Sequence, residues 1–125
     1  MTKLLIVEDN ESLASVMSDT FSDEGYEVKS ASDGEEGLKT AAEFQPDVVL
    51  LDVLMPKMDG LEMLKQLREQ EGGDKVLVMA LTNSDNSEHV LELMNLGVND
   101  YLTKSDWELD DLVKKVQSRL ESHRS

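Results

Sequence analysis

Two apolar runs that end in acidic residues constrain this chain more than any other feature of its sequence. Residues 4–7 (Leu-Leu-Ile-Val) are followed by Glu8 and Asp9, and residues 48–51 (Val-Val-Leu-Leu) are followed by Asp52. Four such residues without helical periodicity predict a strand that is buried on both faces. Open α/β sheets place their ligand sites at the carboxyl ends of such strands. We therefore expect the three acids to meet at one sheet edge, where a divalent cation or a lysine would offset their repulsion.

The composition is typical of one folded domain that does not bind polyanions. The 125 residues include 39% hydrophobic and 31% charged side chains, and the formal net charge is −15. This charge disfavours direct contact with nucleic acid or an anionic membrane. The chain has no cysteine, which excludes disulfides and thiolate catalysis and fits a cytoplasmic location. No apolar run approaches the ~20 residues of a membrane span, so we expect no membrane association.

Apolar periodicity alternates between strand and helix five times along the chain. We expect strands at residues 4–7, 27–31, 47–51, 76–81 and 99–103. A segment with helical spacing follows each strand. In the first of these, Leu13, Val16, Met17 and Phe21 form the apolar stripe, and Gly25 ends the helix. Five such units predict an α/β fold with a parallel sheet and helices on both faces.

Most of the expected helices are preceded by residue pairs that can form a capping box. In this motif a short polar side chain and a glutamate three residues later bond to each other's backbone N–H groups. The pairs are Ser32 with Glu35, Asp59 with Glu62, Asp85 with Glu88, and Ser105 with Glu108. They predict a helix start at each of these points. Asp59 is accordingly interpreted as a cap and not as a ligand.

If the strands are parallel, chemically useful residues from four of them share the carboxyl edge of the sheet. These residues are Glu8, Asp9, Asp52, Thr82 and Lys104. Three carboxylates in one place repel one another unless a hard divalent cation or the ammonium group of Lys104 offsets their charge.

The order of these residues resembles the receiver domain of response regulators, the CheY-like domain of two-component signalling. The matching segments are Glu8-Asp9, Asp52, Met55-Pro56-x-Met58-Asp59-Gly60, Thr82, Gly97-x-x-Asp100-Tyr101 and Lys104. The resemblance covers essentially the whole chain. It implies a (βα)5 flavodoxin-like, doubly wound sheet with strand order 2-1-3-4-5. It also implies a single receiver domain over residues 1–125. We expect no output domain in this chain, so that either the protein acts alone through partners or the sequence is an N-terminal piece of a longer regulator.

The resemblance further implies a site for Mg²⁺ or Mn²⁺ beside a phosphoacceptor. The carboxylates of Asp9 and Asp52 and the backbone carbonyl of Leu54 would bind the ion directly, and Glu8 would act through a bound water. Asp52 would be the nucleophile that accepts a phosphoryl group as an acyl phosphate.

Three residues would read out the modification. Lys104 would place its positive charge on a phosphoryl oxygen, and the Thr82 hydroxyl would donate to another. In the family, the movement of the threonine lets the aromatic ring at the Tyr101 position turn inward. This remodels the helix-strand-helix face within residues 85–120, so the switch is a population shift and not an enzyme activity.

The implied partners follow from this chemistry. The phosphoryl donor would be a sensor histidine kinase or a phosphotransfer protein. The output would be a downstream protein target, or a second copy of the chain, bound through the face within residues 85–120.

The sequence departs from the family pattern at three positions. Ser105 follows Lys104 where the family usually has proline, often after a cis bond, and we predict a trans bond here because a non-proline cis bond costs ~3–4 kcal/mol. Asn83 replaces the usual small residue, and Leu54 cannot hydrogen-bond an attacking water. Both predict slow hydrolysis of the acyl phosphate.

Three other functions could use parts of the same pattern. A flavodoxin-like cofactor binder would need a Ser-, Thr- or Gly-rich first loop, whereas residues 8–10 are acidic and amidic. An aspartyl-nucleophile phosphatase typically has a second acid two residues after the nucleophile, where this chain has Leu54. An interaction module that keeps the motif without being phosphorylated stays open at this level.

Overall fold

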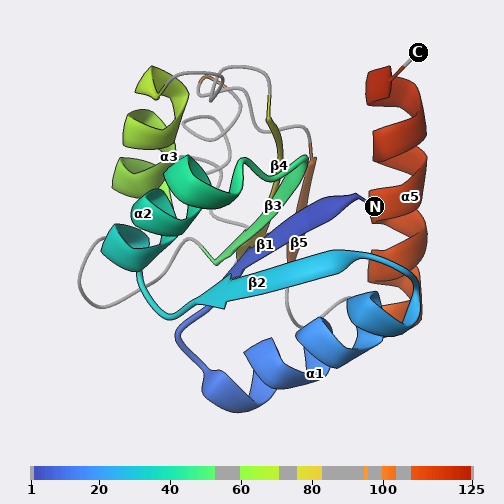
Figure 1. The fold of residues 1–125 in the computed structure, drawn as a ribbon. Helices are drawn as coiled ribbons and strands as arrows, with labels where there is room; N and C mark the ends of the chain where they lie inside the picture. Colours follow the sequence, from blue (N-terminus) through green and yellow to red (C-terminus); the bar gives the residue numbers. More distant parts are fainter. Residues whose placement is uncertain are drawn as a thin grey trace.

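The computed structural model describes residues 2–52, 60–70, 76–82, 95, 100–103 and 108–124 (Figure 1). Its elements are β1 (Lys3–Val7), α1 (Glu11–Asp23), β2 (Glu27–Ala31), α2 (Gly34–Phe44), β3 (Val48–Asp52), α3 (Gly60–Glu69), β4 (Leu77–Thr82), β5 (Asp100–Thr103) and α5 (Leu109–Arg124). All five expected strands are confirmed to within about one residue at each end. Asn95 is the one described residue within the helix expected between β4 and β5, and the cap at Asp59 lies outside the described residues.

The strands form one parallel sheet with the order β2-β1-β3-β4-β5. This confirms the predicted 2-1-3-4-5 topology. The two apolar runs that led to the prediction lie side by side as β1 and β3, with Val7 opposite Leu51. All eight of their apolar residues are fully buried, as expected for central strands covered on both faces.

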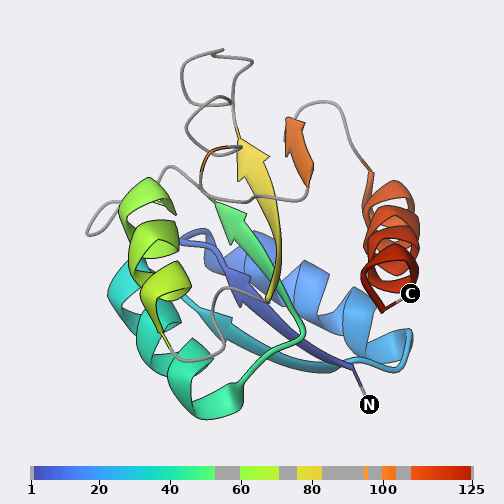
Figure 2. The ribbon, with the colours of Figure 1, turned by 90° about the horizontal axis from the view of Figure 1, so that it is seen from above.

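Helices cover both faces of the sheet. Figure 2 shows α2 and α3 on one side and α1 and α5 on the other. The layer under α2 and α3 contains Leu38, Ala41, Met63 and Leu64 packed on alternate residues of the strands. The opposite layer joins residues of α1 and α5 to the other set of strand residues. The fold is therefore the doubly wound three-layer arrangement that alternation of strand and helix predicts.

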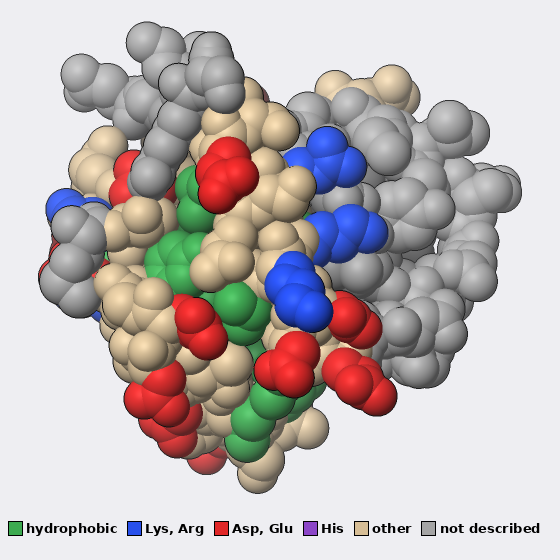
Figure 3. Space-filling view, turned by 90° about the vertical axis from the view of Figure 1, so that its right-hand side faces the viewer, with side chains coloured by type: hydrophobic (Ala, Val, Ile, Leu, Met, Phe, Trp, Pro, Cys, Tyr) green, Lys and Arg blue, Asp and Glu red, His purple; other side chains and the backbone are tan. Residues whose placement is uncertain are grey.

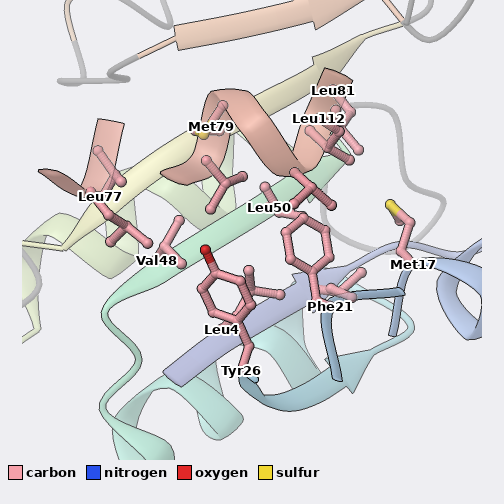
Figure 4. Packing of buried hydrophobic residues seen from close by; sticks show 14 of the residues in the cluster. Leu4, Met17, Phe21, Tyr26, Val48, Leu50, Leu77, Met79, Leu81 and Leu112 are labelled. Carbon is pink, nitrogen blue, oxygen red and sulfur yellow. The ribbon is translucent and has the colours of Figure 1, made fainter. Parts of the chain in front are cut away.

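The layer beneath α1 and α5 is built around aromatic side chains. Phe21 and Tyr26 meet edge to face with ring centroids 5.3 Å apart, and Phe21 is fully buried among the strands (Figure 4). Met17 lies in the same cluster, as the apolar stripe predicted. The assignment of Val16 to that stripe was wrong, because its side chain is 47% exposed. One residue in sequence turns a side chain by about 100° around a helix, which carries Val16 to the solvent side.

The layer beneath α2 depends on a close approach at Gly37. A Cβ atom at this position would lie 3.1 Å from Val7 Cγ2 and 3.2 Å from Met63 Cε. Because Gly37 has no side chain, α2 can pack directly on the end of β1. This contact holds the carboxyl end of β1 in place from one side.

Two of the predicted caps are displaced by one or more residues. At α2 the cap is Asp33, not Ser32: its carboxylate accepts from Glu36 N at 2.9 Å, and Glu36 reaches back to the Ser32 hydroxyl at 2.9 Å. The prediction used Glu35, which is one position too early. At α5 the helix begins at Leu109, and the Glu108 carbonyl accepts from Leu112 N. Glu108 therefore precedes the helix and cannot be the third helical residue that a box with Ser105 requires.

The amino ends of the strands are held together by paired backbone and charged groups. The backbone N–H of Lys3 donates to the Asp47 carboxylate at 2.9 Å, and the backbone N–H of Asp47 donates to the Lys3 carbonyl at 2.8 Å. The ammonium groups of Lys3 and Lys29 lie 5.5 and 5.2 Å from the centre of the Phe44 ring. These contacts tie β1, β2 and β3 to the end of α2.

Within the described ranges, none of the helices combines the length and the apolar content that crossing a bilayer would require.

Candidate functional site

The register of the sheet brings the predicted acidic residues to one edge. Val7 is opposite Leu51, so Glu8 follows β1 at the level where Asp52 ends β3. Asp52 is opposite Leu81, and Thr82 ends the next strand. The backbones of Glu8, Asp52 and Thr82 therefore lie on three neighbouring strands at their carboxyl ends, where parallel α/β sheets bind ligands.

Glu8 is the buried charged residue among those that the structure describes. Its side chain is 2% exposed, and its backbone N–H donates to the Ala31 carbonyl at 3.0 Å. This hydrogen bond extends the β1–β2 pairing by one residue beyond Val7. A buried carboxylate requires compensating charge or hydrogen bonds, so its position at the ligand edge is typical of a functional site.

Asp9 is exposed and lies between Glu8 and the first helix. An aspartate after a strand is commonly a helix cap, but here the next residue has that role. Asn10 caps α1 by accepting from Leu13 N at 3.0 Å. The Asp9 carboxylate is thus not required for the start of the helix, which supports the interpretation that it is a ligand.

The remaining predicted residues are placed only in part. The structure gives the backbones of Asp52, Thr82 and Tyr101, and Tyr101 is opposite Ala80 in the sheet. Leu54, Asn83, Lys104 and the Lys104–Ser105 bond lie outside the described residues.

The carboxylate groups at this edge are of the type that binds a hard divalent cation. Glu8 and Asp9 offer oxygen ligands of the kind that Mg²⁺ and Mn²⁺ prefer. The described side chains alone do not assemble three metal-binding groups in one place. A complete site would need oxygen atoms from Asp52 and the loop after it.

A groove next to Glu8 contains residues that the sequence reasoning missed. Its volume is about 420 Å³, and it runs between α1, the end of β2 and the start of α2. The acids along it are Glu8, Glu11, Asp19 and Glu36, with Ser15, Ser18 and Ser30 between them. The helical spacing of residues 11, 15, 18 and 19 is visible in the sequence, but the sequence does not say that this side of α1 faces β2.

Comparisons with known proteins agree with this geometry. The family model described as response regulator receiver domain matches residues 4–117. The alkaline phosphatase synthesis transcriptional regulatory protein PhoP of Bacillus subtilis is 40% identical over 95% of this chain and 50% of its own length. The transcriptional regulatory protein DltR of Streptococcus agalactiae is 36% identical over 94% of this chain and 51% of its own length. The chain thus spans about half the length of these curated relatives.

Solved structures give the same result. The chemotaxis protein CheY4 of Vibrio cholerae superposes with a TM-score of 0.89 at 35% identity, covering 94% of this chain and 98% of that one. The receiver domain of the sensor histidine kinase PA1611 from Pseudomonas aeruginosa, solved with magnesium in its active-site cleft, gives a TM-score of 0.85 at 28% identity, covering 96% of this chain and 98% of that one.

The fold class is therefore the flavodoxin-like α/β fold, with Glu8 and Asp52 at the carboxyl edge of its sheet. This chain belongs to the response regulator receiver domain family. The general function of that family is a phosphorylation switch in two-component signalling.

Proposed function

We propose that this receiver domain accepts a phosphoryl group on Asp52. The observation that carries the proposal is the convergence of Glu8, Asp52 and Thr82 on adjacent strand ends, next to the exposed acid Asp9. Asp52 ends a fully buried strand and pairs with Leu81 of β4, and the preceding residue Leu51 pairs with β1 and β4. A nucleophile on such a rigid element can be positioned in line with a bound phosphoryl group.

Mg²⁺ or Mn²⁺ would be held by Asp9, Asp52 and the Leu54 carbonyl, with Glu8 contributing through a water. When bound, the ion neutralises charge on the phosphoryl oxygens and so lowers the barrier to transfer. The described residues contribute orientation: buried Glu8 is fixed by the β1–β2 pairing, and Asp9 is placed by the capped start of α1.

Lys104 and Thr82 would bind the transferred group, and Tyr101 would respond to the movement of Thr82. In this account the domain carries out its own phosphorylation but turns over no other substrate, and so it is a switch and not an enzyme. Asn83 and Leu54 would keep hydrolysis slow. If so, the double variant Leu54→Ala, Asn83→Ala should lose the phosphoryl group faster than the parent, and an unchanged rate would contradict this part.

The donor would be a sensor histidine kinase or a phosphotransfer protein in the cytoplasm. The output surface would include β5 and α5. Figure 3 views the side on which α5 lies, where acidic, basic and hydrophobic side chains all reach the surface. The exposed Lys114, Lys115 and Arg119 on α5 make this face less acidic than the net charge of −15 suggests. A protein partner or a second copy could therefore bind there without strong repulsion.

The domain assignment over residues 1–125 and the lack of direct contact with nucleic acid stay predictions. PhoP and DltR are named transcriptional regulatory proteins, and this chain corresponds to half of each.

The direct experiment is intact mass after incubation with phosphoramidate and Mg²⁺. One acyl phosphate adds about 80 Da. We expect this gain in the parent protein and its absence when Mg²⁺ is omitted or when Asp52 is replaced by Asn.

A gain that persists in Asp52→Asn would contradict the assignment of the acceptor. If the parent shows no gain, Asn83→Ala should be treated in the same way, because removal of the larger side chain opens access to the site. Phosphorylation of that variant would support a narrowed pocket, whereas its absence would favour an interaction module that is not phosphorylated.

A further inference from the structure

Strand β2 forms one edge of the sheet, and most of its side chains reach solvent. It pairs only with β1, and four of its five residues are exposed or half-buried. In Figure 1 it lies at the front of the molecule, with α1 below it. An edge of this kind can accept an additional strand from another chain.

The direction of the backbone groups along β2 follows from its pairing with β1. Glu27 N donates to Thr2 O at 2.9 Å, and Ala31 O accepts from Glu8 N at 3.0 Å. In a parallel ladder the residues that bond to one neighbour alternate with those that face away. The N–H and C=O groups of Val28 and Ser30 therefore point outward, and they form no hydrogen bond within the described parts of the chain.

The two faces beside this edge differ in charge. On the α2 side, Lys29 is directed toward the Phe44 ring at 5.2 Å, which keeps its charge away from α1. On the α1 side, Ser30 lines the groove of about 420 Å³. Four carboxylates and no basic side chain line that groove. Ser15 and Ser18 of α1 also line the groove, and their small side chains leave space in it that larger side chains would fill.

We propose that the β2 edge binds an extended basic segment of a partner protein by strand addition. The backbone of the segment would bond to the outward groups of Val28 and Ser30. Side chains alternate between the two faces of a strand, so every second residue would enter the groove on the α1 side. Lysine or arginine at those positions would meet Glu11 and Asp19.

A second copy of this chain is a poorer occupant of the same edge. Two molecules that each carry −15 repel one another. Pairing β2 with β2 would also bring two acidic grooves together, with no basic residue along either of them. A basic segment satisfies both the unpaired backbone groups and the charge of the groove.

The test adds a short peptide of alternating lysine and threonine residues to the full chain. Amide NMR spectra of the protein are the readout. We expect the amide signals of Val28 and Ser30 to shift and to become protected from exchange. N-methylation of the peptide at every second amide should weaken binding about tenfold, since it removes backbone donors but no charge. The protein is unchanged in this comparison, so folding of a variant is not in question.

Two variants distinguish the contribution of backbone hydrogen bonds to peptide binding from the contribution of the groove charges. Ser30→Pro removes one outward N–H and leaves the pairing with β1 intact, and proline is tolerated at an edge in this position. The pair Glu11→Gln and Asp19→Asn removes groove charges, while Glu43→Gln and Glu69→Gln remove the same number from exposed positions of other helices. We expect about tenfold weaker peptide binding for Ser30→Pro and for the groove pair, and little change for the control pair at Glu43 and Glu69.

Equal binding of the methylated and unmethylated peptides, or equal weakening by both charge-removing pairs, would mean non-specific attraction to an acidic protein and would overturn the proposal. The proposal would also be overturned if the Ser30 amide were protected from hydrogen exchange in the absence of peptide while light scattering showed a dimer, since a second copy would then occupy the edge.

Discussion

The two ends of strand β3 carry the same residue type for different purposes. Asp47 precedes the strand, and its carboxylate accepts from the Lys3 backbone at 2.9 Å. Asp52 ends the strand beside Glu8 and Thr82, at the carboxyl edge of the sheet. Asp47 thus ties β3 to β1, and Asp52 lies at the edge where we propose that the phosphoryl group is accepted. The difference teaches that position relative to strand direction, and not residue type, separates the two roles.

The largest expected effect separates the two aspartates directly. Asp52→Asn should abolish phosphorylation by phosphoramidate, because an amide is not a nucleophile for this transfer. Asp47→Asn should be phosphorylated as fast as the parent, since its side-chain oxygen still accepts from Lys3. Intact mass over time measures both rates. A similar loss of phosphorylation rate in both variants would mean that the two aspartates do not differ in role.

A second variant tests the close packing behind the carboxyl edge. Gly37→Leu should lower the free energy of unfolding by about 2 kcal/mol, because the new side chain collides with Val7 and Met63. Lys39→Leu on the exposed side of the same helix is the control and should change stability little. Urea unfolding followed by circular dichroism gives both values, and equal stability of the two variants would show that α2 moves away without strain.

A third variant concerns the cation site. Glu8→Gln should weaken Mn²⁺ binding about tenfold, as the loss of a residue that acts through a metal-bound water typically does. Electron paramagnetic resonance of free Mn²⁺ during titration measures the affinity. Asp47→Asn serves again as the control and should bind like the parent. Unchanged affinity in Glu8→Gln would remove Glu8 from the proposed site.

The smallest effect is expected at the amino end of β3. Asp47→Ala should lower the free energy of unfolding by about 1 kcal/mol, because it removes an exposed hydrogen bond to a charged acceptor. Phosphorylation should not change. A stability loss above that of Gly37→Leu would mean that the amino end contributes more than its contacts suggest.

Much of the fold was predictable because two of its strands consist almost entirely of apolar residues. Residues 4–7 and 48–51 have no polar position, so only a central parallel strand accommodates them. The resemblance of ordered motifs then gave the strand order, which periodicity alone does not contain. The errors were local. Val16 and the caps at Ser32 and Ser105 each depended on a helical phase or a helix start, and those features shift by a residue or more without changing the pattern.

For the candidate site, the sequence predicted which strand ends meet at one edge, but not how their side chains are arranged. Strand direction is enough to place Glu8, Asp52 and Thr82 at one edge. The burial of Glu8 and the use of Asn10 in place of Asp9 as a cap depend on hydrogen bonds that no sequence pattern states. The groove beside β2 was missed for the same reason, since it arises from the relative placement of a helix and an edge strand.

The most direct test of the central claim is to locate the phosphoryl group. Borohydride reduction of the phosphorylated protein converts an aspartyl phosphate to homoserine, and peptide mass spectrometry then identifies the modified residue. The account predicts homoserine at position 52, with Asp9 and Asp47 intact. Reduction at either of those residues, or a mass gain that borohydride does not convert at position 52, would contradict it.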